Sequence, residues 1–293
     1  SSLLFSFSFS CYCMASLPKP YSLKPLTPLF GAIVSNFDWN KDEITASLIQ
    51  SLKEDIKEHR LLLFRDQGKI PGEKQVEISA QLGKLHSTFY QHPKSPHKHI
   101  FRVSNDEKEG CTGVGRTGFH VDGTFLFSPF KYQTMHFHAA SAGGSTWFVP
   151  LKEFYEGQTK EVQEEWNKLW MVARNYCHPL CYKHPVRGDT SMIFHCGKDH
   201  FCNAFIRETE EEGQKRQEVL EPGPLCEELH RKLELATEKI GIKLEWQEGD
   251  FALTDNLGLA HYACPETQLS RNKAGLRILH RTTIAGDSIP ENF

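Results

Sequence analysis

The feature of this 293-residue sequence that most restricts its fold is a succession of short apolar segments, each of strand length. Glycine, proline and polar residues separate them, as is typical of turns. The segments are residues 61–64, 100–104, 118–122, 132–140, 145–150, 191–196, 251–255 and 276–286. Many short strands with few helices favour a single, mainly β domain, built as a sandwich or barrel.

Helical periodicity is confined to a few stretches. In residues 42–60, apolar side chains recur every four positions between charged ones, which predicts an amphipathic helix. Further helices are predicted over residues 72–83, 152–170 and 225–241, the first and last of these ending at a glycine. These helices are expected to pack outside the β domain.

Composition narrows the possible partners. The 34 basic and 37 acidic residues leave a net charge of -3, which gives no electrostatic reason to expect nucleic acid or an anionic membrane as a partner. No apolar run approaches the roughly 18 residues of a membrane-spanning helix. We therefore expect a small-molecule substrate and a cytoplasmic protein, with homo-oligomerisation left open.

The first 19 residues are expected to lie outside the folded domain. Met14 is the first methionine, and the serine-rich apolar stretch before it lacks a basic flank. We interpret residues 1–19 as a disordered leader or upstream translated segment, with a targeting role left open. Residues 20–293 would then form the single domain.

The nine cysteines do not predict a disulfide framework, because their number is odd and their density is low. Reduced thiols in a cytosolic protein fit better. Several cysteines alternate with histidines between residues 177 and 202, an arrangement that raises the question of a structural zinc site. Their spacings do not repeat a paired pattern, so cysteines that bind no metal are the preferred interpretation.

His120 and Asp122 stand two positions apart within residues 118–122. On a strand, alternate side chains point to the same face, so the imidazole and the carboxylate would converge. Nitrogen and oxygen ligands of this kind favour iron, zinc or manganese over calcium or magnesium. His261 is the candidate third ligand, since two histidines and one carboxylate form the facial triad of non-haem Fe(II) enzymes.

Two arginines accompany these candidate ligands. Arg277 and Arg281 share one face of the last predicted strand. A buried arginine is costly without an anionic partner, and a guanidinium binds carboxylates bidentately. Beside a metal triad they favour a dicarboxylic cosubstrate; without one, two solvent-exposed arginines at a sheet edge would be the simpler interpretation.

The chain resembles the taurine-dioxygenase-like (TauD/TfdA) family of Fe(II)- and 2-oxoglutarate-dependent oxygenases along nearly its whole length. The matching segments include "LLLFRDQ", "QLGKLH", "FHVDGTF", "AGGSTWF", "WQEGDFALTDNLGLAHYA" and "LRILHRTTIAGD". Their order and spacing are more specific than any one of them. The resemblance implies a double-stranded β-helix, or jelly roll, with peripheral helices.

The resemblance also assigns residues to the site. His120, Asp122 and His261 would bind Fe(II) and form the catalytic centre. The remaining assignments concern 2-oxoglutarate, whose far carboxylate would be held by Arg281 with a hydrogen bond from Thr146 and help from Arg277. O2 would be the other cosubstrate, with succinate and CO2 released. Apolar side chains such as Phe125 and Phe194 would keep water from the reacting atoms.

Departures from the family pattern bear on the substrate. Thr88 stands where taurine-oxidising members have a histidine that meets the sulfonate, Ser145 replaces a usual aspartate, and Leu257 stands where an arginine is common. These changes argue against taurine and leave a small substrate with a polar or charged end. The ligand set does not distinguish hydroxylation from desaturation or cyclisation.

Two other functions are compatible with the candidate ligands. Three protein ligands and an open position also serve zinc hydrolases, although that reading leaves Arg281 and Thr146 without a role. A jelly roll that only binds a ligand is the non-enzymatic alternative. The presence of all three ligands and of the arginine favours the oxygenase.

Overall fold

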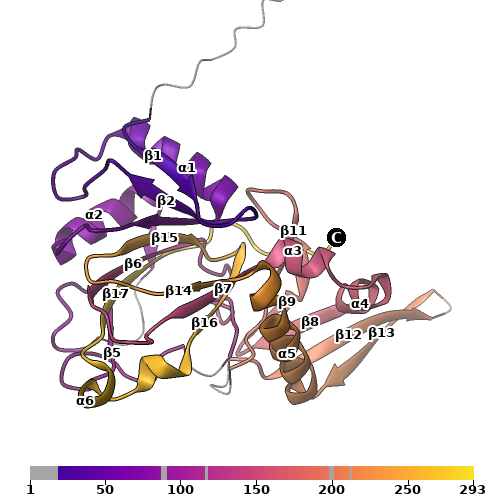
Figure 1. The fold of residues 1–293 in the computed structure, drawn as a ribbon. Helices are drawn as coiled ribbons and strands as arrows, with labels where there is room; N and C mark the ends of the chain where they lie inside the picture. The colour runs from indigo at the N-terminus through magenta and orange to yellow at the C-terminus, as the bar shows by residue number, and fades with distance from the viewer. Residues whose placement is uncertain (1–18, 87–90, 116–117, 198–200, 212) are drawn as a thin grey trace, which may run out of the picture.

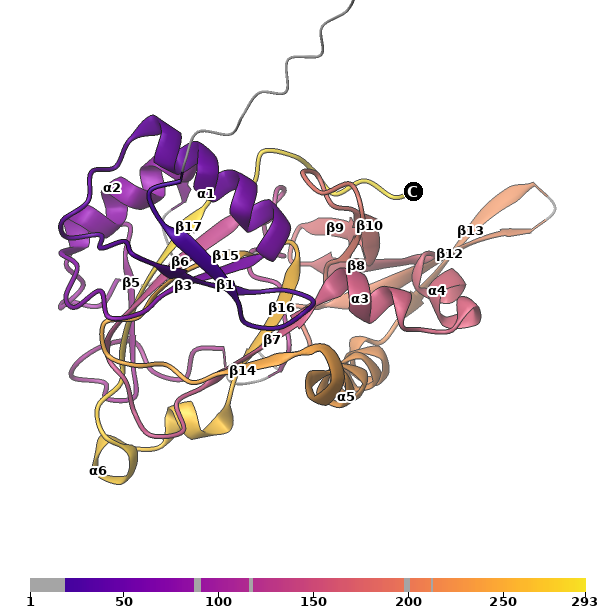
Figure 2. The ribbon, with the colours of Figure 1, turned by 45° about the horizontal axis from the view of Figure 1, so that its top comes forward.

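The computed structural model describes residues 19–86, 91–115, 118–197, 201–211 and 213–293 (Figures 1 and 2). All but the last residue of the expected leader therefore lies outside the described residues. In the described part of the chain, no helix is both long and apolar enough to cross a bilayer.

The largest sheet contains eight strands in the order β1-β2-β3-β15-β6-β17-β4, with β5 also paired to β17. All neighbours are antiparallel except β2 and β3. The strands are β1 (Ser22–Pro25), β2 (Ala32–Ser35), β3 (Leu61–Phe64), β4 (Leu85–His86), β5 (Phe101–Ser104), β6 (Tyr132–Ala139), β15 (Phe251–Asp255) and β17 (Ile278–Ile284).

A second sheet packs against the inner face of the first (Figure 1). It contains β14 (Ile242–Leu244), β7 (Thr146–Pro150) and β16 (Leu259–Ala263), in the order β14-β7-β16. Phe137 and Leu279 of the large sheet meet Phe148 and Leu259 of the small sheet in one buried cluster. Apolar side chains on facing strands thus hold the two sheets together, which confirms the predicted jelly roll.

Two helices cover the outer face of the large sheet, as Figure 2 shows. Helix α1 (Ala46–His59) begins where the Thr45 side chain accepts a hydrogen bond from the Leu48 backbone. Its Leu48, Leu52 and Ile56 are buried, as the four-residue spacing predicts. Helix α2 (Gly72–Leu82) packs on β6 and β17, the strands that carry the site residues described below.

The remaining elements form a layer beside the jelly roll, from which the β12–β13 hairpin projects (Figure 2). One sheet has the order β13-β12-β8-β9, and β10 pairs with β11. These elements are α3 (Leu151–Glu156), α4 (Lys160–Trp166), β8 (Leu169–Ala173), β9 (Tyr176–Pro179), β10 (Cys181–Lys183), β11 (Thr190–Met192), β12 (Ala204–Glu211), β13 (Gln214–Leu220) and α5 (Pro222–Ile240). A short 3-10 helix, Pro265–Gln268, and α6 (Arg271–Ala274) follow β16.

The predicted helix over residues 152–170 is corrected by the structure. Helix α3 ends at Gly157, Thr159 caps the start of α4 through the backbone of Val162, and the chain enters β8 at Leu169. Pairing of β8 with both β9 and β12 outweighs the helical pattern of its sequence.

The predicted strand over residues 118–122 is also corrected. Only His120 makes β-type contacts there, as isolated bridges to His195 on one side and His261 on the other, and Asp122 lies in a turn. Likewise, the strand predicted over residues 191–196 is limited to Thr190–Met192. The segment around His120 is therefore extended and held between two neighbours without belonging to a sheet.

Candidate metal centre

The three predicted ligands meet in space. His120, Asp122 and His261 each offer a nitrogen or oxygen atom, and these atoms lie within 4.8 Å of one another. Asp122 Oδ2 is 3.3 Å from His261 Nε2, and Asp122 Oδ1 is 3.9 Å from His120 Nε2. Among the described residues, this is the one such group of histidine, cysteine or carboxylate side chains.

Backbone pairing fixes the two histidines. His120 and His261 exchange hydrogen bonds, from His120 N to His261 O at 3.1 Å and from His261 N to His120 O at 3.0 Å. The His120 ring places Nδ1 2.8 Å from the Gly118 carbonyl, a contact suited to donation by Nδ1–H. That tautomer leaves the lone pair on Nε2, the nitrogen that faces Asp122, free to bind a metal.

Asp122 is held by a polar network. Gln133 on β6 donates to Asp122 Oδ2 at 2.7 Å, and Arg281 on β17 donates to the same oxygen at 2.6 Å. Asn256 accepts from the Asp122 backbone N–H at 3.0 Å and donates to its carbonyl at 2.9 Å. Such partners orient a ligating carboxylate before any metal binds.

The charges in the centre favour metal-binding protonation states. Burial, together with the neighbouring His261 and His195, lowers the pKa of His120 well below its ordinary value. Burial alone would raise the pKa of Asp122, but Arg281 and His261 outweigh it and hold that pKa well below its usual range. A neutral imidazole and an ionised carboxylate are the forms that bind a divalent metal.

Arg277 differs from Arg281 in its surroundings. It is 4% exposed, its Nε has no hydrogen-bond partner, and the structure shows no acidic partner for it among the described residues. Burial lowers the pKa of Arg277 to about 10. Its guanidinium lies 5.1 Å from the centre of the Phe137 ring.

Thr146 is linked to Arg277 through two stacked rings. Trp246 donates to Thr146 Oγ1 at 2.9 Å and stacks on Phe137 with ring centres 4.2 Å apart. The hydroxyls of Ser141 and Ser145, nearby in the chain, are buried and have no hydrogen-bond partner among the described residues. A Cβ added at Gly144 would lie 2.5 Å from Ser141 Oγ and 3.4 Å from Arg277 Cδ, which brings the orphaned hydroxyl and the arginine to one place.

The two phenylalanines that were predicted to form an apolar wall lie beside the segments that flank the ligands, and the wall itself stays a prediction. Phe194 is fully buried, and its carbonyl accepts from the Val121 backbone between the two ligands. Phe125 contacts Phe201, which in turn lies 4.9 Å from the ring of His195. Thr88 and the neighbouring loop at residues 87–90 lie outside the described residues.

The cysteine- and histidine-rich stretch does not form a metal site in the described part of the chain. His178 is hydrogen-bonded to the carbonyls of Thr124 and Leu126, and His184 lies 3.1 Å from a carboxylate oxygen of Asp255. His200 lies outside the described residues. The histidines at 178 and 184 are therefore explained by hydrogen bonding within the fold.

Sequence reasoning missed Gln133 and Asn256. Gln133 lies on the same face of β6 as the buried Met135 and Phe137, and a polar residue in line with apolar ones is the available signal. Asn256 lies in the turn between β15 and β16, where its sequence position does not reveal the contact with Asp122. His195, whose ring lies 4.8 Å from that of His120, was considered only as a zinc ligand.

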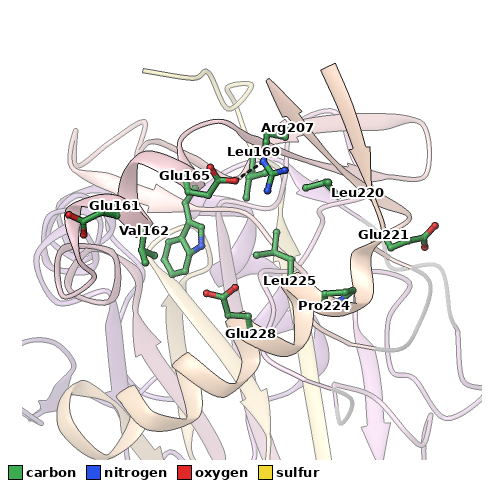
Figure 3. A pocket seen from close by; sticks show the side chains of 11 residues that line it. Glu161, Val162, Glu165, Leu169, Arg207, Leu220, Glu221, Pro224, Leu225 and Glu228 are labelled. Carbon is green, nitrogen blue, oxygen red and sulfur yellow. Dashed lines mark hydrogen bonds and ion pairs between the residues drawn. The ribbon is translucent and has the colours of Figure 1, made fainter. Parts of the chain in front are cut away.

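A separate cavity of about 490 Å³ opens in the outer layer between α4, α5 and β12 (Figure 3). Trp166 and Leu169 contribute to its apolar lining, and Glu165 pairs there with Arg207 at 2.6 Å. None of the three candidate ligands lines it. This surface cavity is distinct from the metal centre.

A jelly roll that brings two histidines and one carboxylate together at a mostly buried site is the arrangement of a metal-dependent enzyme. Residues 22–283 match the model of the family described as "Taurine catabolism dioxygenase TauD, TfdA family". The chain belongs to this family and is a 2-oxoglutarate-dependent dioxygenase. The predicted family, fold and enzyme class are thus confirmed.

Relatives match along nearly the whole chain. An alpha-ketoglutarate-dependent sulfate ester dioxygenase from Pseudomonas putida is 21% identical to this protein, and the match covers 94% of this chain and 93% of the relative. The structure of a putative alpha-ketoglutarate-dependent taurine dioxygenase from Burkholderia xenovorans has a TM-score of 0.71 at 22% identity. The match covers 92% of this chain and 94% of the Burkholderia chain. The structure of AAD-2 with Mn(II) and N-oxalylglycine has a TM-score of 0.70 at 18% identity. The match covers 92% of this chain and 99% of the AAD-2 chain.

Proposed function

We propose that His120, Asp122 and His261 hold Fe(II) and that the protein uses it to oxidise a small organic substrate. One observation carries the metal assignment: the three side chains offer ligand atoms within 4.8 Å of one another at a mostly buried site. Two histidines and one carboxylate leave positions open on iron, as oxygenase chemistry requires. The Mn(II) complex of a structural relative supports the choice of a transition metal.

We propose Arg277 as the principal anchor for the far carboxylate of 2-oxoglutarate. Arg281 was expected in that role, but it donates to Asp122, whereas Arg277 is buried without an acidic partner among the described residues. The orphaned Nε of Arg277 and the nearby Ser141 hydroxyl fit a carboxylate that is absent from the structure. Thr146 would complete this carboxylate site, and Arg281 would lie nearer the metal.

The protein's own residues then have separate tasks. Gln133, Asn256 and Arg281 hold Asp122 in place, Arg281 also keeps it ionised, and the Gly118 carbonyl fixes the tautomer of His120. We expect Phe194 to help exclude water, because it is fully buried and its backbone pairs with Val121 between two of the ligands. When bound, Fe(II) and 2-oxoglutarate supply the oxidising chemistry, in which O2 is consumed and succinate and CO2 are released.

The substrate that we propose is a small molecule with a polar or anionic end. Arg281 uses one nitrogen to pair with Asp122, while its buried Nε has no partner, so a donor remains beside the metal. A relative whose name specifies sulfate esters is consistent with an anionic end. Hydroxylation, desaturation and cyclisation all begin at the same centre, and each remains compatible with it.

The test is 2-oxoglutarate turnover by the purified protein. With Fe(II), O2 and a panel of sulfate esters, sulfonates and carboxylates, we expect succinate to be released, and one substrate class to accelerate it. Asp122→Ala should abolish this release, and Arg207→Gln, in the separate cavity, should leave it unchanged. Equal succinate release by wild type and Asp122→Ala would contradict the proposal.

A further inference from the structure

Three cysteines meet next to the metal centre without a role in the proposed chemistry. Cys226 lies in the first part of α5 and is buried, whereas Cys196 and Cys202 are partly exposed and pack against the same apolar cluster. The Cys226 Sγ is 3.6 Å from the carbonyl of His195, the residue bonded directly to Cys196. The cluster therefore joins a helix of the outer layer to the segment that flanks His120.

The three thiols are electrostatically coupled. Hydrogen bonds from Cys196 and Cys202 lower the pKa of the Cys226 thiol, and the pKa of each flanking thiol is raised. By contrast, burial alone raises the pKa of Cys181, in the same apolar cluster. A thiolate stabilised by neighbouring thiols is the arrangement found in redox-sensitive cysteines.

Metal binding does not explain this cluster. The described residues contain one group of three close metal-ligand atoms, and it comprises His120, Asp122 and His261. The three sulfurs do not converge in that way. Thiol oxidation is a chemistry that neighbouring thiols undergo without a metal.

The cluster is mechanically connected to His120 through Phe119. Cys196 N donates to the Phe119 carbonyl at 2.9 Å, and the Phe119 N–H donates to His230 Nδ1 at 3.3 Å. His230 and Cys226 are four residues apart on α5 and so lie on one face of the helix. The backbone immediately before His120 is thus held from both sides by the two elements that carry the cysteines.

We propose that Cys196, Cys202 and Cys226 form a peroxide-sensitive thiol centre in which Cys226 and Cys196 become a disulfide that weakens metal binding at His120. Cys226 thiolate attacks one oxygen of hydrogen peroxide, which gives a sulfenic acid and, after proton uptake, water. The Cys196 thiol then attacks the Cys226 sulfur, forming the S–S bond and releasing a second water. Two thiols lose two electrons and the peroxide gains them.

The disulfide affects the metal centre because it shortens a contact. Two separate thiols must approach to about 2.05 Å when they are joined. Either α5 or the Cys196 segment has to move, and both contact the Phe119 backbone. The proposed loss of metal affinity rests on the metal assignment made above, whereas disulfide formation does not.

The first experiment locates the disulfide. The reduced, metal-free full chain is treated with a small excess of hydrogen peroxide, free thiols are alkylated, and peptides are mapped by mass spectrometry. We expect a Cys196–Cys226 link in wild type and in the Cys181→Ala control, and no such link in Cys226→Ala or Cys226→Ser. Three alkylated thiols after treatment, or a link from Cys226 to Cys202 instead, would overturn the assignment.

The second experiment measures Mn(II) affinity before and after peroxide, because Mn(II) reports metal binding without turnover. Oxidation should weaken Mn(II) binding about tenfold or more, as other disturbances of a ligand's support do, and dithiothreitol should restore it. Cys226→Ser should bind Mn(II) equally well before and after treatment. Unchanged affinity despite a mapped disulfide would refute the coupling, whereas failure of the untreated protein to bind Mn(II) would refute the metal assignment itself.

Discussion

Two arginines lie on the inner side of β17, Arg277 just before the strand and Arg281 in its middle, and they differ in how their charges are compensated. Arg281, near the metal centre, donates to Asp122 at 2.6 Å. Arg277 is buried more deeply than Arg281 and has no acidic partner among the described residues. One guanidinium is neutralised by the protein itself, and the other is left for a ligand.

This difference separates two roles that the sequence could not distinguish. A buried charge without a partner lowers the stability of the ligand-free protein and is retained where a bound ligand supplies the counter-charge. A paired charge instead fixes a neighbour, here the ligand Asp122. Arg277 is therefore assigned to the cosubstrate and Arg281 to the metal side.

The largest effect is expected from Asp122→Ala, which removes both a metal ligand and the partner of Arg281. Mn(II) affinity, measured by calorimetry, should fall at least about 100-fold, because one of three protein ligands is lost. His195→Gln is the matched control, since His195 contacts the ring of His120 without belonging to the ligand group. Loss of Mn(II) binding in the control alone would mean that His195, and not Asp122, is a metal ligand.

Arg277→Met should have the next largest effect. The affinity of the Mn(II)-loaded protein for 2-oxoglutarate should fall by about 1.5–3 kcal/mol, roughly ten- to 150-fold, as charge-assisted hydrogen bonds are lost. The melting temperature of the ligand-free protein should not fall, because an uncompensated buried charge has been removed. A less stable variant with unchanged affinity would show that Arg277 is structural.

Arg281→Met should change 2-oxoglutarate affinity less and metal binding in a pH-dependent way. Arg281 lowers the pKa of Asp122, so its removal raises that pKa and allows protons to compete with the metal at higher pH. The acid limb of Mn(II) binding should therefore shift to higher pH than in wild type. An unshifted limb with a large loss of 2-oxoglutarate affinity would restore Arg281 as the carboxylate anchor.

The smallest effect, a change in the pH dependence of stability, is expected from a histidine on the outer face of β17. The rings of His280 and His138 are tilted, with their centres 3.9 Å apart. Burial, with His138 and Arg102 nearby, lowers the pKa of His280 to about 2. Because the unfolded chain binds the proton first, near pH 6.5, stability is complete above that pH and falls as the pH drops below it. Urea unfolding between pH 7.5 and 5 should show this loss.

The variant His280→Gln should reduce that loss by at most about 1.4 kcal/mol per pH unit. An unchanged pH slope in the variant would show that His280 does not contribute to the loss of stability, and it would contradict the lowered pKa of this residue. Arg102 and Lys69 also face this histidine group, so they are kept unchanged in the comparison.

The sequence predicted that three candidate ligands would meet, because their chemistry is carried by residue type. His120, Asp122 and His261 could be identified from their pattern and the family resemblance, and the structure brings them together. The sequence did not predict that the segment 118–122 is held by isolated bridges, since those contacts come from distant segments. Arg277 and Arg281 differ in whether an acidic side chain meets them in space, and the periodicity of the sequence carries no such information.

The most direct test of the account is an anaerobic titration of the metal-free protein with Fe(II) and 2-oxoglutarate. We predict a weak visible charge-transfer band from an iron-chelated keto acid, which bleaches when air is admitted. Iron binding without this band would contradict the assignment of 2-oxoglutarate to this centre, and with it the role proposed for Arg277.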